Sequence, residues 1–147
     1  MDSPTWEHVA ANLSVPAKPT GLWTLAVPYV PPKSLVKILA AGSWNYAGSQ
    51  SCGPDGVHEP AGAVTQTSCI CKDALVGSLV GKIGGGTPDT AGKTFGVGSY
   101  GVIRVGADEG GPLFLAINDA QGHFDDNGGA ITVQIFIAAE VKSPAAT

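Results

Sequence analysis

The chain has 147 residues and a formal net charge of −4, and only 14% of its residues are charged. This length suits one domain with a substantial core, and an apolar content of 44% argues against a disordered chain. Lys and Arg form no cluster that would attract nucleic acid, and no apolar run reaches the roughly 18 residues of a membrane-spanning helix. We therefore expect a protein that neither binds nucleic acid nor inserts into a membrane.

In chain order, apolar and polar residues alternate along most of the sequence, and turn residues interrupt the alternation. A period of two is typical of strands that bury one face. Residues 43–62 lack a long apolar run, and their glycines and prolines predict one long irregular loop. The apolar spacing of residues 73–84 also fits a helix, but Gly77 and Gly81 favour a strand. We predict strands over residues 6–15, 22–30, 35–42, 63–71, 73–84, 94–107, 112–118 and 130–141.

Short strands at regular spacing predict the fold class. We expect an all-β protein, a jelly-roll-like two-sheet β-sandwich that forms a single domain over residues 1–147. Pro28 indicates that the second strand lies at a sheet edge or carries a bulge, because proline cannot donate a ladder hydrogen bond. Residues 85–93 are predicted to form a loop, and residues 141–147 a frayed tail.

The start of the chain and its cysteines both bear on where the protein resides. Residues 1–15 have neither the basic start nor the apolar core of a secretory signal. We expect a cytoplasmic protein, with release by a route that needs no signal peptide as the alternative. Cys52, Cys69 and Cys71 are an odd number, which argues against a disulfide framework. Their spacing, with His58, matches no common zinc pattern, so we favour buried thiols and keep a zinc site as the alternative.

Two enzyme motifs fit the sequence only in part. The glycine-rich stretch 84–94 is similar to a phosphate-binding loop, but Thr87 stands where the motif requires its first glycine. A nucleophile elbow needs Gly-x-Ser-x-Gly, and Val97 stands in place of the first glycine before Ser99. No local signature therefore indicates an enzyme.

Residues 118–129, NDAQGHFDDNGG, gather oxygen-bearing side chains between two apolar strands. They include three aspartates and two asparagines. Asp119 follows one predicted strand, and Asp126 and Asn127 precede the next, so a hairpin would bring the three side chains together. Calcium prefers about six to eight oxygen ligands, but Asp, Asn and Gly are also the ordinary residues of turns. The loop by itself leaves both a calcium site and a solvated turn open.

The loop, its flanks and three further stretches resemble the calcium-dependent galactose-binding lectins of the Pseudomonas PA-IL type. The resemblance covers nearly the whole chain and is best between residues 35 and 135. It implies a small jelly-roll-like sandwich that assembles as a homotetramer, with Ca²⁺ as cofactor, a galactose-type mono- or oligosaccharide as ligand, and no catalytic activity. The stretches that carry it are VKILAAGSWNYAG (36–48), CGPDG (52–56), CKDALVGSLVGKIG (71–84) and INDAQGHFDDNGGAITVQI (117–135).

The resemblance also implies which residues bind the ion. Backbone carbonyls would come from Tyr46 and His123, and side-chain oxygens from Asp119, Asp126 and Asn127. Asp126 departs from the family pattern, which has asparagine there; a carboxylate adds negative charge and removes an amide donor. Two adjacent sugar hydroxyls would complete the coordination and donate hydrogen bonds to the acidic ligands.

The sugar-selecting stretch departs most from the family. The family has a His-Pro-x-Gln stretch that contacts the remaining sugar hydroxyls, and the corresponding region here reads GPDGVHEPAG (53–62). His58 or Glu59 falls at the place of the family's histidine, and no glutamine follows within this stretch. The predicted sugar contacts are therefore His58 and Glu59, together with Asp119, His123 and Asp126 of the loop.

Two non-enzymatic functions follow from these patterns. The first is a calcium-dependent lectin that forms a dimer or tetramer. The second is a lectin-like sandwich that keeps the fold but binds a different sugar or serves as a non-sugar interaction module. A hydrolase that uses the same cleft ranks last, because no local motif supports it.

Overall fold

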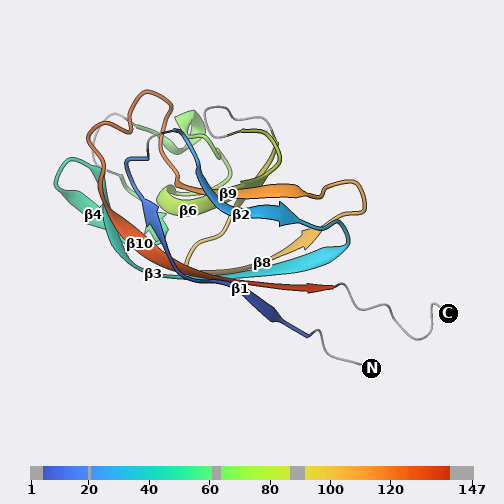
Figure 1. The fold of residues 1–147 in the computed structure, drawn as a ribbon. Helices are drawn as coiled ribbons and strands as arrows, with labels where there is room; N and C mark the ends of the chain where they lie inside the picture. The colour runs from blue at the N-terminus through green and yellow to red at the C-terminus, as the bar shows by residue number, and fades with distance from the viewer. Residues whose placement is uncertain (1–4, 20, 61–63, 87–91, 140–147) are drawn as a thin grey trace.

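The computed structural model describes residues 5–19, 21–60, 64–86 and 92–139, and Figure 1 shows its fold. Two layers of antiparallel strands face each other, which confirms the predicted all-β two-sheet sandwich in a single domain. The strands are β1 (Glu7–Pro16), β2 (Thr24–Val30), β3 (Ser34–Ala47), β4 (Gln50–Cys52), β5 (Asp55–Val57), β6 (Val76–Ile83), β7 (Lys93–Gly96), β8 (Tyr100–Val105), β9 (Gly111–Ile117) and β10 (Gly128–Ala139), and η1 (Gln66–Ser68) is a 3-10 turn.

Each sheet has five strands. The first has the order β1–β10–β3–β4, with β8 also paired to β3. The second has the order β2–β9–β6–β5, with β7 also paired to β6. β2 lies at a sheet edge and its register shifts on either side of Val27, as Pro28 predicted. Within the described ranges, no helix has the length and apolar character to cross a membrane.

Five of the predicted strands are confirmed as β1, β2, β6, β9 and β10, with small differences at their ends. Residues 73–84 form a strand rather than a helix, as their glycines favoured. The predicted loop 85–93 falls partly outside the described residues, and the predicted tail 141–147 falls wholly outside them.

The prediction of one irregular loop over residues 43–62 was wrong. The strand predicted over 35–42 continues to Ala47, because β10 pairs with β3 as far as Asn45 opposite Gly128. β4 and β5 follow it within the same region. Ala41, Gly42 and Ser43 are exposed and show no apolar alternation, so only the pairing with β10 reveals the extension.

The prediction of one strand over residues 94–107 was also wrong. β7 lies in the second sheet and β8 in the first, so the chain crosses between the layers at residues 97–99. The Asp55 carboxylate holds this crossing, since it accepts hydrogen bonds from the backbone N–H of Ser99 at 2.7 Å and from its hydroxyl at 3.0 Å. Gly98 turns the chain with φ +70°, a conformation that glycine adopts readily.

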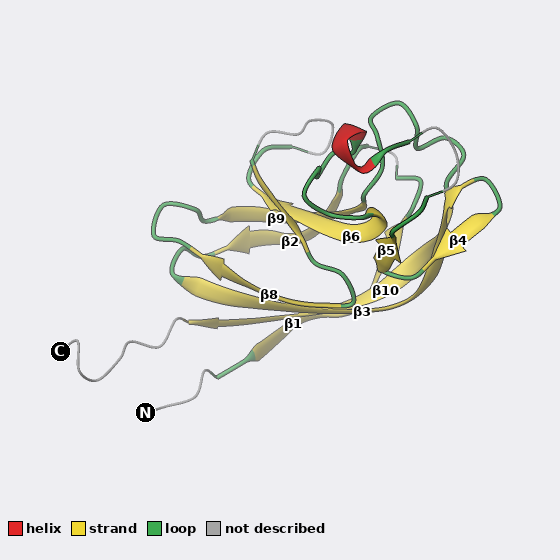
Figure 2. Cartoon of the chain, turned by 180° about the vertical axis from the view of Figure 1, so that it is seen from behind, coloured by secondary structure: helices red, strands yellow, loops and turns green. Residues whose placement is uncertain are grey.

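The predicted strand over residues 63–71 is absent from residues 64–71, which the structure describes. This segment forms η1 instead, because Ser68 donates to the Thr65 carbonyl from its N–H at 3.0 Å and from its hydroxyl at 2.7 Å. Figure 2 shows η1 on the side of β6 that faces away from the first sheet. The segment therefore covers the outer face of the second sheet.

Burial on both faces of β6 defines the core. All eight residues of β6 are buried. Leu79 packs in the main core between the sheets, whereas Val80 packs outward with Trp23, Cys71 and Phe114. The segment around Cys71 is thus held against the outer face of β6.

Gly77 lies at a tightly packed position of β6. It has φ +82°, and a Cβ there would lie 2.6 Å from Cys52 Sγ. Gly77→Ala should lower the free energy of unfolding by about 3 kcal/mol through backbone strain and overpacking. Gly48 is the control, with φ +58° and no atom within 4 Å of the added Cβ. Gly48→Ala should cost about 1 kcal/mol in denaturant unfolding. Equal losses for the two variants would contradict the packing described here.

Candidate functional site

The acidic loop between β9 and β10 lies beside the turn between β3 and β4. Figure 1 shows the two together at one end of the sandwich, the loop in brown-orange and the turn in green. The N–H of Gly48 donates to the Asp126 carbonyl at 2.9 Å. Asn45 pairs with Gly128 at the start of β10. These contacts place the loop end next to the backbone that follows Tyr46.

Asn118 anchors the start of the loop. Its side chain is fully buried, and Oδ1 accepts a hydrogen bond from the Cys71 N–H at 2.9 Å. Its Nδ2 donates to the carbonyls of Cys71 and Ala74, both at 2.9 Å, and of Leu75 at 3.1 Å. The carboxamide thereby ties the end of β9 to the segment that covers β6, and this sets the direction in which the next residue leaves the strand.

Asp119 is buried with one carboxylate oxygen unpaired. The side chain has 0% exposure, and Oδ1 accepts a hydrogen bond from the Ala120 N–H at 2.7 Å. Oδ2 has no hydrogen-bond partner among the described residues. A buried acceptor without a donor costs about 1–3 kcal/mol, and more if it is charged.

Asn127 supplies a second oxygen of the same kind. Its Nδ2 donates to the Ala17 carbonyl at 3.1 Å. A carbonyl can only accept, so the amide nitrogen must be the atom that faces Ala17. Oδ1 of Asn127 then lies buried and, like Asp119 Oδ2, has no donor in the part of the chain that the structure describes.

The pKa of Asp119 shows which groups surround its carboxylate. Burial raises this pKa above its ordinary value, and the nearby negative charge of Asp126 raises it further. The Asn127 amide and the Ala120 N–H lower it by less than burial raises it, and the effects of Asp126 and of His123, which lowers it, are the smallest. Asp126, Asn127 and His123 therefore all lie within electrostatic reach of Asp119.

The other predicted ligands lie at the same end of the molecule. His123 and Asp126 are exposed, and the His123 N–H closes a turn with the Ala120 carbonyl at 2.9 Å. The Tyr46 side chain is buried in the main core, so only the backbone carbonyl of this residue could bind a cation. Among the described residues, no three His, Cys, Asp or Glu side chains come together. A cation here would thus take two carboxylates and draw its other oxygens from amide and backbone groups.

The cysteines do not assemble a zinc site in the described residues. All three are free thiols. Burial raises the pKa of Cys52 to about 11, and burial together with the Asp119 charge raises that of Cys69 to about 12. Because zinc binds the thiolate, these thiols suit packing rather than ligation.

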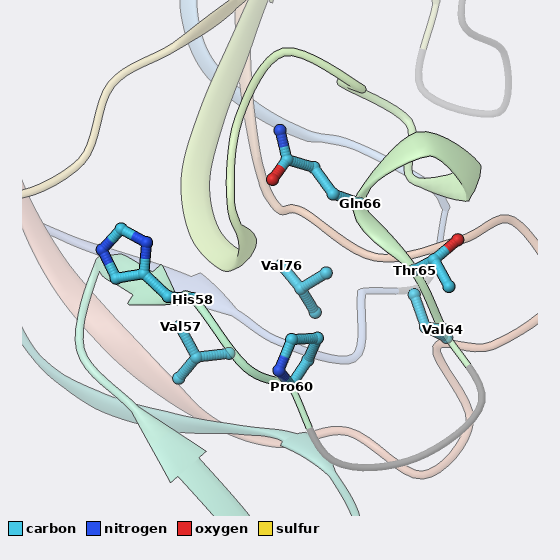
Figure 3. A pocket seen from close by; sticks show the side chains of 7 residues that line it. All are labelled: Val57, His58, Pro60, Val64, Thr65, Gln66 and Val76. Atoms are coloured by element: carbon cyan, nitrogen blue, oxygen red, sulfur yellow. The ribbon is translucent and has the colours of Figure 1, made fainter.

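The two sugar-contact residues predicted outside the loop lie directly after β5. His58 lines an open pocket of about 300 Å³ together with Val57, Pro60, Val64, Thr65, Gln66 and Val76 (Figure 3). Glu59 is exposed and does not line this pocket. Within the described ranges, no hydrogen bond or ion pair joins His58 or Glu59 to the loop of Asp119. The structure therefore groups Asp119, His123, Asp126 and Asn127 near the backbone of Tyr46. The sugar contacts of His58 and Glu59 stay a prediction.

Sequence reasoning did not single out Asn118 or the pocket residues Thr65 and Gln66. A polar side chain at the end of the apolar run GPLFLAI is a signal for a buried, fully bonded amide, and it could have identified Asn118. Ser68, three positions after Thr65, could likewise have indicated a local turn in place of a strand.

A comparison with family models decides the family. The model described as PA-IL-like protein matches residues 15–140. The chain belongs to the PA-IL-like family. The match includes β2 to β10 and the last two residues of β1, and it includes all the candidate ligands.

Solved structures include a protein with the same fold as this PA-IL-like chain. It is described as the EclA N-terminal domain, a PllA-like lectin, with 18% identity and a TM-score of 0.62. The similarity covers 87% of this chain and 96% of that one, and at such low identity it shows a shared fold alone. No curated protein matches the chain.

Asp119 should destabilise the metal-free protein, because its pKa is raised on folding. A raised carboxyl pKa favours the protonated form in the folded state. The stability that this protonation contributes is fully present below the unfolded pKa of about 3.9 and is lost as the pH rises through the higher folded pKa. Asp119→Asn removes the buried charge and adds a donor beside Asn127 Oδ1. We expect it to raise the free energy of unfolding at neutral pH by about 1 kcal/mol.

Denaturant unfolding with a chelator, at several pH values from acidic to neutral, measures this effect. The advantage of Asp119→Asn should grow as the pH rises. A variant less stable than the wild type at neutral pH would show that the Asp119 carboxylate is compensated within the protein.

Proposed function

We propose that this PA-IL-like protein is a calcium-dependent lectin for galactose-type sugars and has no catalytic activity. One observation carries the proposal: Asp119 Oδ2 and Asn127 Oδ1 are buried in the same loop, and neither meets the geometric criterion for a hydrogen bond in the described residues. The Asn127 side chain is close enough to the Asp119 carboxylate to lower its pKa. Two such acceptors, with the Asp126 charge nearby, are what a bound cation would compensate.

The donor set fits Ca²⁺. Carboxylate, amide and backbone oxygens are hard ligands, and calcium accepts such mixtures in flexible geometry. Asp119, Asp126 and Asn127 would supply side-chain oxygens, and Tyr46 and His123 would supply carbonyls. A bound Ca²⁺ would offer coordination positions to two adjacent sugar hydroxyls. This supports the ligand set that the family resemblance implies.

Each residue of the site would have a distinct role in binding the cation or the sugar. Asp119 is held from behind by Asn118 and by its own bond to the Ala120 N–H, so its free oxygen keeps one position without losing side-chain entropy on binding. Asp126 is exposed and would accept a charge-assisted hydrogen bond from a sugar hydroxyl at the mouth of the site. His58 and Glu59 would contact the sugar from the neighbouring loop.

We further propose that the lectin forms a dimer or a tetramer. A single shallow site that chelates two hydroxyls gives modest affinity, and several copies on one assembly raise the avidity. The family assignment and the fold shared with a PllA-like lectin support a sugar-binding role. They leave the sugar and the assembly to experiment.

Titration calorimetry with Ca²⁺ and with methyl galactoside tests the function. The wild type should bind calcium, and its sugar binding should disappear with a chelator. Asp119→Ala should abolish both while the far-ultraviolet circular dichroism stays unchanged. Calcium binding without any response to a panel of sugars would favour the interaction module, and normal sugar binding by Asp119→Ala would exclude this site.

Asp126 and its neighbour Asp125 give a matched pair for the charge at the site. Both are exposed, but only Asp126 perturbs Asp119. Asp126→Asn should lower the calcium affinity about tenfold, because ligand charge tunes calcium affinity. Asp125→Asn should leave it nearly unchanged in the same calorimetric titration. If the two variants weaken binding equally, Asp126 acts through the general field of the loop rather than as a ligand.

A further inference from the structure

β8 is an edge strand of the first sheet. Among the strands of the described residues it pairs with β3 alone, and it does so without a register shift. The Ala40 N–H donates to the Ser99 carbonyl at 2.9 Å, and bonded pairs recur at every second residue of an antiparallel ladder. Every second residue after Ser99 therefore turns its backbone groups toward β3. The residues between them, Tyr100, Val102 and Arg104, point their backbone N–H and C=O groups outward from the edge.

The side chains of the same three residues share the outer face of the sheet. Tyr100 is 61% exposed, Val102 is 47% exposed, and Arg104 is also exposed. Val105, which belongs to the inner face, is buried. A regular edge strand with exposed apolar side chains can pair with a strand of another chain.

The other outer strands are short or irregular. The pairing of β1 has two register shifts, and Asn12 within it has φ +56°. β2 contains Pro28 and also has register shifts. β4 has three residues and β7 has four. Bulges, proline and short length all hinder pairing at an edge, so β8 is the edge best suited to it in the part of the chain that the structure describes.

We propose that β8 pairs antiparallel with β8 of a second copy of this chain, about a two-fold axis at Val102. In this register Val102 lies opposite Val102 of the second copy, and Tyr100 lies opposite Arg104 of the second copy. All three pairs are of the hydrogen-bonded kind, because the outward backbone groups of one strand face those of the other. A guanidinium opposite an aromatic ring is an attractive cross-strand pair, and no like charges lie opposite each other. The strand is thus complementary to itself, as a two-fold interface requires.

This pairing leaves the acidic loop open to a ligand. β8 lies along Ser34–Leu39 of β3, whereas Tyr46 and the acidic loop lie at the other end of β3 (Figure 1). The inference rests on the proposed assembly into a dimer or tetramer and names the surface that forms it. Binding of calcium and sugar by one copy does not depend on it.

Sedimentation velocity of the full-length, calcium-loaded protein at several concentrations tests the interface. The wild type should self-associate. Val102→Lys and Val102→Glu each place two like charges at the axis, so each should weaken the association about tenfold. An equal mixture of the two variants should associate again, because opposite charges then meet at position 102. Leu25→Lys is the control, since Leu25 is 46% exposed on the edge strand β2 and its change should leave the association unaltered.

Amide hydrogen exchange on the wild type gives a second measurement that needs no variant. The N–H groups of Tyr100, Val102 and Arg104 should exchange more slowly as the protein concentration rises. A monomeric wild type, association that neither Val102 variant weakens, or a mixture that does not associate again would each overturn the inference. If such a protein still binds calcium and methyl galactoside, the lectin function stands. A wild type that associates through β8 but binds neither calcium nor sugar overturns the proposed lectin function and leaves this interface standing.

Discussion

The carboxamide of Asn118 is the interaction on which the functional end of this protein depends. Its four hydrogen bonds join the first residue after the core strand β9 to three carbonyls and one N–H of the segment 71–75. That segment covers β6 and follows η1, and its Lys72 carbonyl accepts a hydrogen bond from Gln66. Because the carboxamide is fully bonded and buried, it also determines where Asp119 begins the acidic loop. Asn118 therefore stabilises both the packing of the segment 71–75 and the start of the acidic loop.

The acidic loop has more buried acceptors than donors, and the proposed cation would compensate this imbalance. A loop that served only as a turn would expose its carboxylates to water, where they cost nothing. Here burial raises the pKa of Asp119, and the amide nitrogen of Asn127 donates its hydrogen bond to the Ala17 carbonyl. The protein thus keeps two oxygens pre-positioned at a cost in stability, which is typical of binding sites.

The pocket that His58 lines is built around β6. Its lining comes from the segment that begins at Val57 in β5, from the residues at the start of η1 and from Val76 of β6. Val57 pairs with Val76, which gives the pocket a rigid apolar floor.

How much the sequence could predict differs from element to element. The alternation of apolar residues was enough to predict β1, β9 and β10, since each buries one face or ends in turn residues. It failed for β3 beyond residue 42 and for the break between β7 and β8, because pairing with β10 and the Asp55 bonds to Ser99 decide those points. It also failed at residues 64–71, where local hydrogen bonds of Thr65 and Ser68 outweigh strand propensity.

The sequence by itself determined the fold class, the composition of the acidic loop and, through its motifs, the likeness to PA-IL-type lectins. Period and residue type are local properties, and they survive without knowledge of contacts. Only the tertiary structure decided that Asp119 Oδ2 and Asn127 Oδ1 are buried without donors, and that His58 and Gln66 line a separate pocket. Burial and hydrogen-bond pairing depend on partners more than forty residues away, such as Cys71 for Asn118 and Ala17 for Asn127, and no local pattern encodes them.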